Sequence, residues 1–187
     1  ITPRRIAAID GQPVARTGDA ERVMSERSAF FVTDILADAD ARAYVFGRGG
    51  SLEFPFPVAA KTGTSQAYRD NWAIGFTPEV TVGVWVGNFD RTPLRDSSGV
   101  TGAGPIFHDV MIAAVERVRG SMPTGDRRPI AGPPADVRQA EVCALSGLAP
   151  HSACPTRVME WLPVGASLAR CAWHHHAGSD RLTIWPA

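Results

Sequence analysis

The chain has 187 residues, of which 44% are hydrophobic and 20% are charged, a balance typical of a globular protein rather than a disordered one. Basic and acidic residues number 19 each, so the zero net charge gives no reason to expect nucleic acid or an anionic membrane surface as a partner. No apolar run approaches the ~20 residues of a membrane-spanning helix. This length suits one domain with an appendage.

A helix is expected after an irregular opening segment, residues 1–27. Apolar side chains then recur at helical spacing, and the expected buried face carries Phe31, Val32, Ile35, Leu36 and Ala39. Ser25 or Ser28 is the expected N-cap, because a serine oxygen can accept a hydrogen bond from a free amide of the first turn. The glycines from Gly47 to Gly50 are expected to end the helix.

Three strands are expected next, at residues 58–65, 71–76 and 80–89. In the third, valine recurs at every second position from Val80 to Val86, which is the period of a sheet. The connections between the three segments are short, so neighbouring strands should be antiparallel.

A second helix is expected from Pro105 to the residue before Gly120, because apolar side chains recur every four residues and proline favours a first helical turn. Helices and antiparallel strands in this order predict an α+β fold, an antiparallel sheet flanked by helices. Composition shifts after residue 120. We therefore expect a first unit at residues 1–120, a Pro/Gly-rich linker at 121–134 and a small irregular Cys-containing appendix at 135–187.

Lys61 is the only lysine of the chain, and it begins the string Lys61-Thr62-Gly63-Thr64 inside the first predicted strand. A P-loop is excluded, because that motif needs glycine where this chain has Ala60 and Pro55. The plain structural alternative is a surface lysine in a strand next to a turn.

A Lys-Thr-Gly strand can also serve acyl transfer. Alternation puts Lys61 and Gly63 on one face and the two threonines on the other. The ammonium can stabilise negative charge and help move protons, and the hydroxyls of Thr62 and Thr64 can hold a substrate carboxylate. The backbone N–H of Thr64 can donate to an oxyanion, and Gly63 leaves room for close approach.

Longer strings resemble class A penicillin-binding proteins. These are residues 61–65, 69–78 and 82–90, with shorter similarities at 32–36, 40–42 and 100–105. The phrase Gly87-Asn88-Phe89-Asp90 is similar to the 1C subgroup, as are the surroundings of Cys143 and Cys154 in the tail. The resemblance covers residues 28–120 and extends into the tail.

The resemblance implies part of a bifunctional cell-wall enzyme on the periplasmic side of the inner membrane, with a glycosyltransferase domain upstream. Its transpeptidase would crosslink peptidoglycan stem peptides through a serine acyl-enzyme, and β-lactams would trap that serine. It would need no cofactor. Lys61 and Thr64 would be catalytic, and Thr62, Gly63 and Thr64 would bind substrate.

Two further motifs of the family, S-x-x-K and S-x-N, do not occur in the sequence; Val58 stands three residues before the lysine. We therefore expect a fragment that needs the rest of its parent chain, including an N-terminal anchor, and that penicillin does not acylate alone. The alternatives are another β-lactam-reactive serine hydrolase, either a carboxypeptidase or a β-lactamase, and a non-catalytic module that binds the wall or a protein.

The tail contains Cys143, Cys154, Cys171 and His174. Three thiolates and one imidazole suit structural zinc, whereas an extracytoplasmic location favours one disulfide and a free thiol. Both interpretations stay open at this point. The run of three histidines that begins at His174 is expected to be an exposed turn, and residues 181–185 are expected to begin a further β unit.

Overall fold

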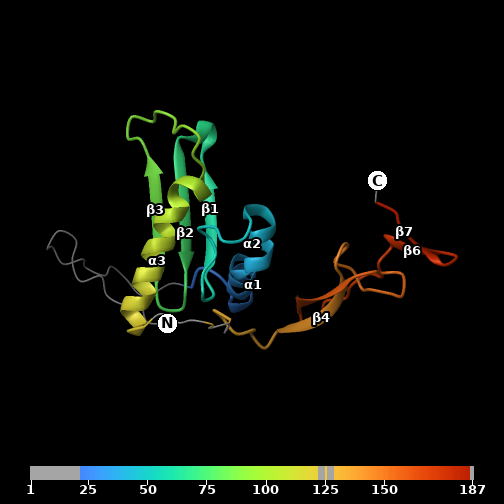
Figure 1. The fold of residues 1–187 in the computed structure, drawn as a ribbon. Helices are drawn as coiled ribbons and strands as arrows, with labels where there is room; N and C mark the ends of the chain where they lie inside the picture. The colour runs from blue at the N-terminus through green and yellow to red at the C-terminus, as the bar shows by residue number, and fades with distance from the viewer. Residues whose placement is uncertain (1–21, 122–124, 126–128, 186–187) are drawn as a thin grey trace.

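The structure is a computed structural model that describes residues 22–121, 125 and 129–185. Residues 1–21 of the predicted irregular opening and residues 122–124 and 126–128 of the predicted linker therefore lie outside the described residues, whereas Glu26 and Arg27 are helical, not irregular. A long helix, α3 (Gly104–Arg119), packs on one face of a three-stranded sheet, and two shorter helices, α1 (Glu26–Ala37) and α2 (Ala39–Phe46), lie beside the edge strand β1 (Ala59–Thr64) (Figure 1). Among the described residues, no helix combines the length and apolar character needed to cross a membrane.

The first predicted helix is two helices, α1 (Glu26–Ala37) and α2 (Ala39–Phe46). Ser25 caps α1 as predicted, and its hydroxyl oxygen accepts a hydrogen bond from the amide of Ser28 at 3.1 Å. Asp38 breaks the run, because its side chain caps the second helix by accepting from the amide of Ala41 at 2.8 Å. The expected apolar face is wrong, because none of its five members is buried: the buried residue of α1 is Phe30, which that face did not include, and Val32 and Ile35 are exposed.

The sheet confirms the three predicted strands and their antiparallel order, β1 (Ala59–Thr64), β2 (Asp70–Phe76) and β3 (Thr81–Gly87). A short 3₁₀ turn, η1 (Gln66–Tyr68), joins the first two strands. The register pairs Lys61 with Ile74 and Thr64 with Asn71. These pairings make β1 the outer strand on its side of the described sheet.

The predicted second long helix is α3 (Gly104–Arg119), which follows a wide helical turn, η2 (Gly99–Ala103), where only a loop was expected. Phe107, Met111 and Val115 are fully buried on the face of α3 that packs on the sheet. Gly75 makes this packing possible, because a Cβ there would lie 2.7 Å from the ring of Phe107. Each such buried side chain contributes roughly 1.5–3 kcal/mol of apolar transfer free energy.

The tail contains more regular structure than its sequence predicts. Strands β4 (Val137–Cys143) and β5 (Arg157–Pro163) pair antiparallel, as do β6 (His174–Ala177) and β7 (Asp180–Thr183). The histidine run therefore lies in a strand, not in a turn. Residues 181–183 belong to the second strand of a hairpin, not the first strand of a further unit. Gly178, with φ at +63°, begins the tight turn that allows this pairing.

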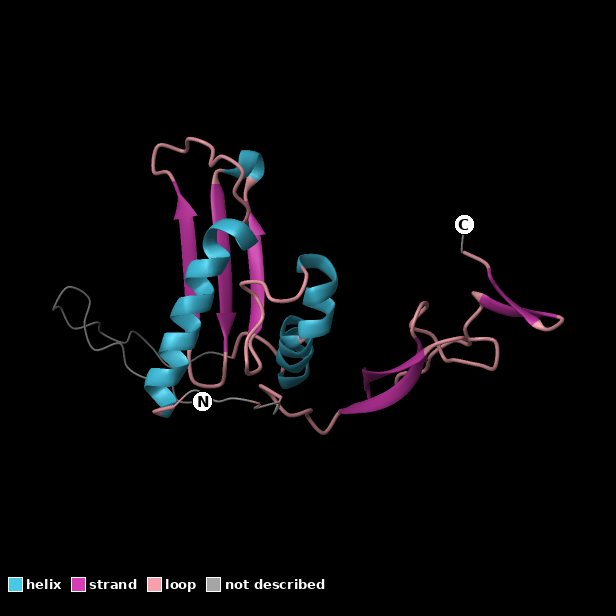
Figure 2. Cartoon of the chain, in the orientation of Figure 1, coloured by secondary structure: helices cyan, strands magenta, loops and turns pink. Residues whose placement is uncertain are grey.

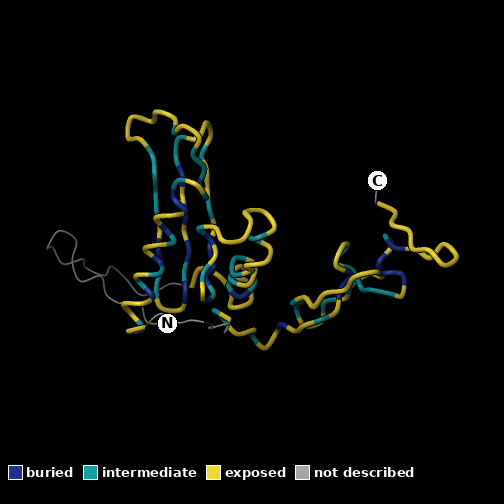
Figure 3. Tube along the Cα trace, in the orientation of Figure 1, coloured by how far each residue is buried: buried dark blue, intermediate teal, exposed yellow. Residues whose placement is uncertain are grey.

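The tail contacts the first helix through one aromatic pair and one ion pair. The rings of Phe30 and Trp161 meet edge to face with centroids 5.3 Å apart, and Arg27 lies 3.0 Å from Asp136. The strands of the tail otherwise stand away from the sheet (Figure 2). Buried residues accordingly gather in two places, one beneath α3 and one in the tail (Figure 3).

Candidate functional site: the Lys61 strand and the cysteine–histidine cluster

Lys61 lies on an open face of the sheet. Its side chain is exposed, and its amine donates a hydrogen bond to the carbonyl oxygen of Thr62. Trp72 and Ile74 on the neighbouring strand are 43% and 48% exposed, and they pair with Gly63 and Lys61. The only lysine of the chain therefore stands on an apolar surface that no described element covers.

The backbone of β1 presents hydrogen-bonding groups along its outer edge. The amide of Ser65 donates to the carbonyl oxygen of Asp70 at 2.9 Å, so these residues form a hydrogen-bonded pair. In an antiparallel ladder, such pairs alternate with pairs whose amides point away from each other. Thr64, opposite Asn71, and Thr62, opposite Ala73, therefore direct their N–H groups away from β2. The Thr64 amide has the orientation that an oxyanion donor requires.

Gly99, rather than Gly63, permits the close approach at this site. A Cβ on Gly63 would meet Trp72 at an ordinary 3.6 Å, whereas one on Gly99 would lie 2.6 Å from the carbonyl oxygen of Gly63. The Gly99 amide donates to the hydroxyl oxygen of Thr64 at 2.9 Å. Gly99 was not among the predicted site residues, and its only signal in the sequence is its place in a glycine-rich stretch before the last helix.

Asp70 connects the two hairpins at the end of the strands. The Ser65 hydroxyl and the Trp85 indole donate to its carboxylate at 2.8 and 3.1 Å. These hydrogen bonds lower the pKa of Asp70 below its ordinary value. The indole of Trp85 also packs over Gly87, so this tryptophan has a packing role.

Asn71 secures the loop that leads to η2. It is fully buried, and its side-chain amide donates to the hydroxyl of Ser97 at 2.6 Å. Gly102 packs directly against both groups, since a Cβ there would lie 2.5 Å from the Asn71 side-chain nitrogen. Asp70 and Asn71 therefore have structural roles, because their side chains hold a turn and a loop in place.

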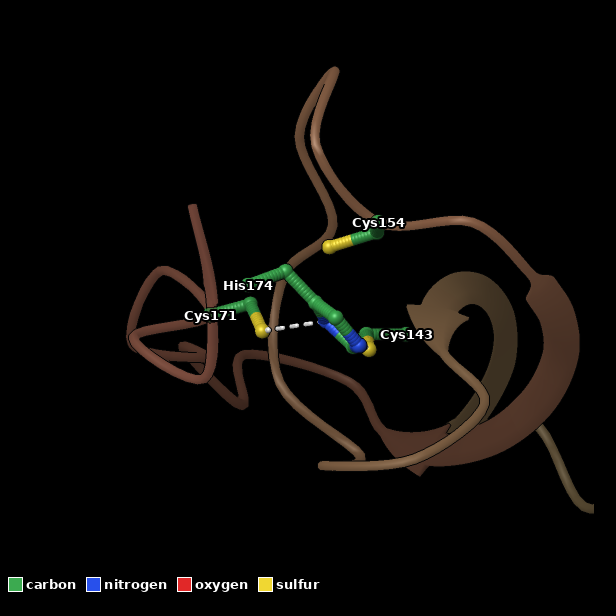
Figure 4. A group of neighbouring side chains, drawn as sticks. All are labelled: Cys143, Cys154, Cys171 and His174. Atoms are coloured by element: carbon green, nitrogen blue, oxygen red, sulfur yellow. Dashed lines mark hydrogen bonds between the residues drawn. The ribbon is translucent and has the colours of Figure 1, made fainter. Parts of the chain in front are cut away.

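In the tail, the structure brings together the four predicted ligand residues. The candidate ligand atoms of Cys143, Cys154, Cys171 and His174 all lie within 4.8 Å of one another. The four side chains come from the end of β4, the following loop, the segment before β6 and the start of β6 (Figure 4). They are 0%, 4%, 4% and 2% exposed, in that order. All three cysteines are free thiols.

The protein environment favours thiolates at two of the three cysteines. Burial works against ionisation of Cys171, but the Ser146 hydroxyl and the amides of Trp173 and His174 bring its pKa down to about 7. Burial likewise opposes ionisation of Cys143, yet hydrogen bonds from Ser146 and Leu145 leave its pKa below the ordinary value. At Cys154, burial and the neighbouring sulfurs raise the pKa. Hydrogen bonds therefore favour the ionised form of two of the three thiols, and burial disfavours it in the third.

Comparison with known proteins gives consistent relatives, although no model of a protein family matches the chain. Penicillin-binding protein 1C of Escherichia coli K12 is 30% identical over 168 residues, which cover 87% of this chain and 20% of that protein. Penicillin-binding protein 1A of Clostridium perfringens is 29% identical over 74% of this chain and 15% of its own length. The chain thus spans about a fifth or less of these relatives, at 20% and 15%.

A solved structure supports the same assignment of the fold. The crystal structure of penicillin-binding protein 1A from Haemophilus influenzae superposes with a TM-score of 0.61 at 21% identity, covering 84% of this chain and 23% of that one. The fold is therefore that of part of a penicillin-binding protein. Together with the sequence relatives, it is consistent with this chain being part of a class A penicillin-binding protein. The match to the 1C protein must extend past the linker into the tail, since it covers 87% of the chain, and this extent favours the 1C type.

Proposed function

We propose that β1 forms one wall of the active site of a peptidoglycan DD-transpeptidase, in a protein of the 1C type. The observation that carries the proposal is the outer edge of β1, where an exposed lysine and two outward-facing threonine amides lie within four consecutive residues. The relatives are named for penicillin binding, and a lactam carbonyl and a peptide carbonyl require the same oxyanion donors.

Thr64 would serve both parts of the substrate. Its backbone N–H would donate to the oxyanion of the tetrahedral intermediate, because it points away from the sheet. Its hydroxyl oxygen already accepts a hydrogen bond from the Gly99 amide, so the hydroxyl proton is directed elsewhere and can be donated to a substrate carboxylate. Thr62 would supply a second hydroxyl. Gly63, between the two threonines, would add no side chain to the surface of the strand.

Lys61 would provide the positive charge of this wall. Its ammonium would favour negative charge that develops during acyl transfer and would assist proton movement at the nucleophile. The open apolar face around it, with Trp72 and Ile74, is the surface on which a nucleophile-bearing segment would pack. We propose that this segment belongs to the same longer protein, which would be anchored in the inner membrane, face the periplasm and carry a glycosyltransferase domain upstream.

The substrates would be the stem peptides of peptidoglycan, and β-lactams would act as covalent inhibitors. The reaction itself would need no cofactor, because acyl transfer between a serine and an amine requires only positioning, proton transfer and oxyanion stabilisation. A carboxypeptidase or β-lactamase would use the same wall. The product distinguishes them: a crosslink for a transpeptidase, and a hydrolysed peptide or lactam for the others.

Intact-mass analysis with penicillin tests the proposal. The 187-residue chain should remain unmodified, whereas the full-length parent protein should gain the mass of one penicilloyl group on a serine. Stable acylation of the 187-residue chain alone would show that β1 does not depend on a nucleophile elsewhere. A folded full-length protein that never acylates would leave the non-catalytic binding module as the better account.

A further inference from the structure

The four-residue cluster of the tail carries an inference that goes beyond acyl transfer and stands without it. We propose that Cys143, Cys154, Cys171 and His174 bind one Zn²⁺ ion in a closed, structural site. The ion would hold the strands and loops of residues 137–183 in their folded arrangement. It would take no part in the transpeptidase reaction.

The spacing of the donor atoms fits a tetrahedral zinc ion. Zinc binds thiolate sulfur at about 2.3 Å and imidazole nitrogen at about 2.0–2.1 Å, so a tetrahedral arrangement separates these two donors by about 3.5 Å. The Nδ1 atom of His174 lies 3.4 Å from the sulfur of Cys143 and 3.4 Å from that of Cys171. The sulfur of Cys154 completes a set whose members all lie within 4.8 Å of one another.

The set of ligands is that of a structural zinc site, not a catalytic one. Three cysteines and one histidine fill the four positions of a tetrahedral ion, and catalytic zinc instead keeps one position for water or substrate. All four side chains are buried, so no described surface gives a substrate access to the centre of the cluster.

Groups around the cluster supply hydrogen bonds to the ligating sulfurs. The Ser146 hydroxyl donates to the sulfur of Cys171 at 3.3 Å, and the His151 amide donates to that of Cys154 at 3.4 Å. The imidazole of His151 also lies 2.9 Å from the carbonyl oxygen of Cys171, which joins two ligand-bearing segments. Such outer contacts orient metal ligands and stabilise charge on sulfur.

The tail has little else to hold it together. Among the described residues, its buried cluster consists of the three cysteines, with Leu148 and Trp173 packed against them, and Val137, Val142 and Ala153 are buried outside this cluster. Its strands form two separate two-stranded ladders, and a two-stranded ladder is marginal by itself. The four ligands come from three segments of the tail, because Cys171 and His174 are only three residues apart, and one ion would connect all three segments. Small units with cores of this size commonly depend on a metal or a disulfide.

A disulfide accounts for fewer of these observations. It would join two sulfurs and leave the third as a buried free thiol, and it would give no role to His174. That imidazole is 2% exposed, and its Nδ1 faces two sulfurs. A buried histidine aimed at thiols is explained directly as a metal ligand.

The metal content of the full 187-residue chain tests the proposal, with the protein purified under reducing conditions and without a polyhistidine tag. After zinc loading and dialysis, mass spectrometry of the metal should give one zinc per chain. The His174→Ala variant should bind zinc at least 100-fold more weakly, because it loses a ligand, not merely an outer contact. The adjacent His175→Ala is the matched control and should retain one zinc, since His175 lies outside the cluster.

Two further measurements keep the test decisive if the alanine variant fails to fold. His174→Cys should keep one zinc, because four thiolates also bind zinc tetrahedrally. Cobalt in place of zinc should give the intense visible absorption of a tetrahedral thiolate site, and His174→Cys should alter that spectrum. Wild-type protein without zinc, equal loss in His175→Ala, or a disulfide between two of the cysteines in protein isolated without reductant would each overturn the proposal. None of these readouts depends on penicillin binding.

Discussion

At the scale of single residues, polar side chains at the ends of the strands decide how the hairpins join. Asp70 is the clearest case, because one carboxylate accepts from Ser65 in the turn and from Trp85 on the next strand. Both contacts depend on the ionised form. The stability that they contribute therefore varies with pH, in a direction set by the lowered pKa of Asp70.

Asp70→Asn should destabilise the protein at pH 7, and the difference from wild type should shrink on acidification. The folded state binds the Asp70 proton more weakly than the unfolded chain. Its contribution is therefore complete above the unfolded pKa of about 3.9 and is lost as the pH falls through the lower, folded value. Urea midpoints at pH 7 and at successively lower pH measure this. Glu116→Gln on the exposed face of α3 controls for the loss of one charge, and a pH-independent penalty for Asp70→Asn would contradict the account.

Ser146 should tune the proposed zinc site without being a ligand. Ser146→Ala removes the hydroxyl that donates to Cys171, so zinc affinity should fall about 10–100-fold while one zinc is still bound at saturation. Competition with a chromophoric chelator measures the change. Ser152→Ala is the matched control, because its hydroxyl contacts His176 instead of the cluster. Equal affinities of the two variants would argue against thiolate stabilisation by Ser146.

At the scale of elements, the contact between η2 and β1 positions the edge proposed to bind substrate. Gly99→Ala should destabilise the protein by about 1–3 kcal/mol, because the new Cβ would meet backbone oxygens of Gly63 and Trp72 that cannot move alone. Denaturant titration measures this loss. Gly132→Ala is the control, as no atom lies within 4 Å of its Cβ position. Equal stability of Gly99→Ala and wild type would mean that η2 does not press on β1.

The elements that the sequence predicts well are those with an uninterrupted period. Alternating valines in β3 and apolar residues every fourth position in α3 identify both, because each period places one face in the core. The helix break at Asp38 was not predicted, because it arises from a local capping hydrogen bond that competes with a continuous helix. The tail strands were not predicted, because their side chains are largely exposed and their sequences show no apolar alternation.

The two candidate sites also differ in how far the sequence alone predicts them. Lys61 to Thr64 could be found from the string itself, because consecutive residues of a strand have fixed faces. The four tail ligands could be predicted from their residue types. Their close approach in space could not, because it depends on how distant segments of the chain fold together. Gly99 could not be found, since its importance comes from a backbone approach to Gly63 across 36 positions of the chain.

At the scale of the whole molecule, the two buried clusters predict separate responses to metal removal. A chelator should abolish amide protection in β4 and β6, whereas β2 and α3 should keep theirs, because the cluster beneath α3 shares no residue with that of the tail. Hydrogen exchange followed by mass spectrometry resolves these segments. Uniform loss of protection across both parts would show that the tail and the sheet fold as one cooperative unit.

The most direct test of the transpeptidase proposal is fluorescent-penicillin labelling of the full-length parent protein with Lys61→Ala. We expect the labelling rate to fall by more than about 100-fold, because proton transfer and charge stabilisation at a nucleophile contribute at least that much. Arg117→Ala, which removes a cation from the exposed side of α3, should label at the wild-type rate. A folded Lys61→Ala protein that labels as fast as wild type would contradict the assignment of β1 to the active site.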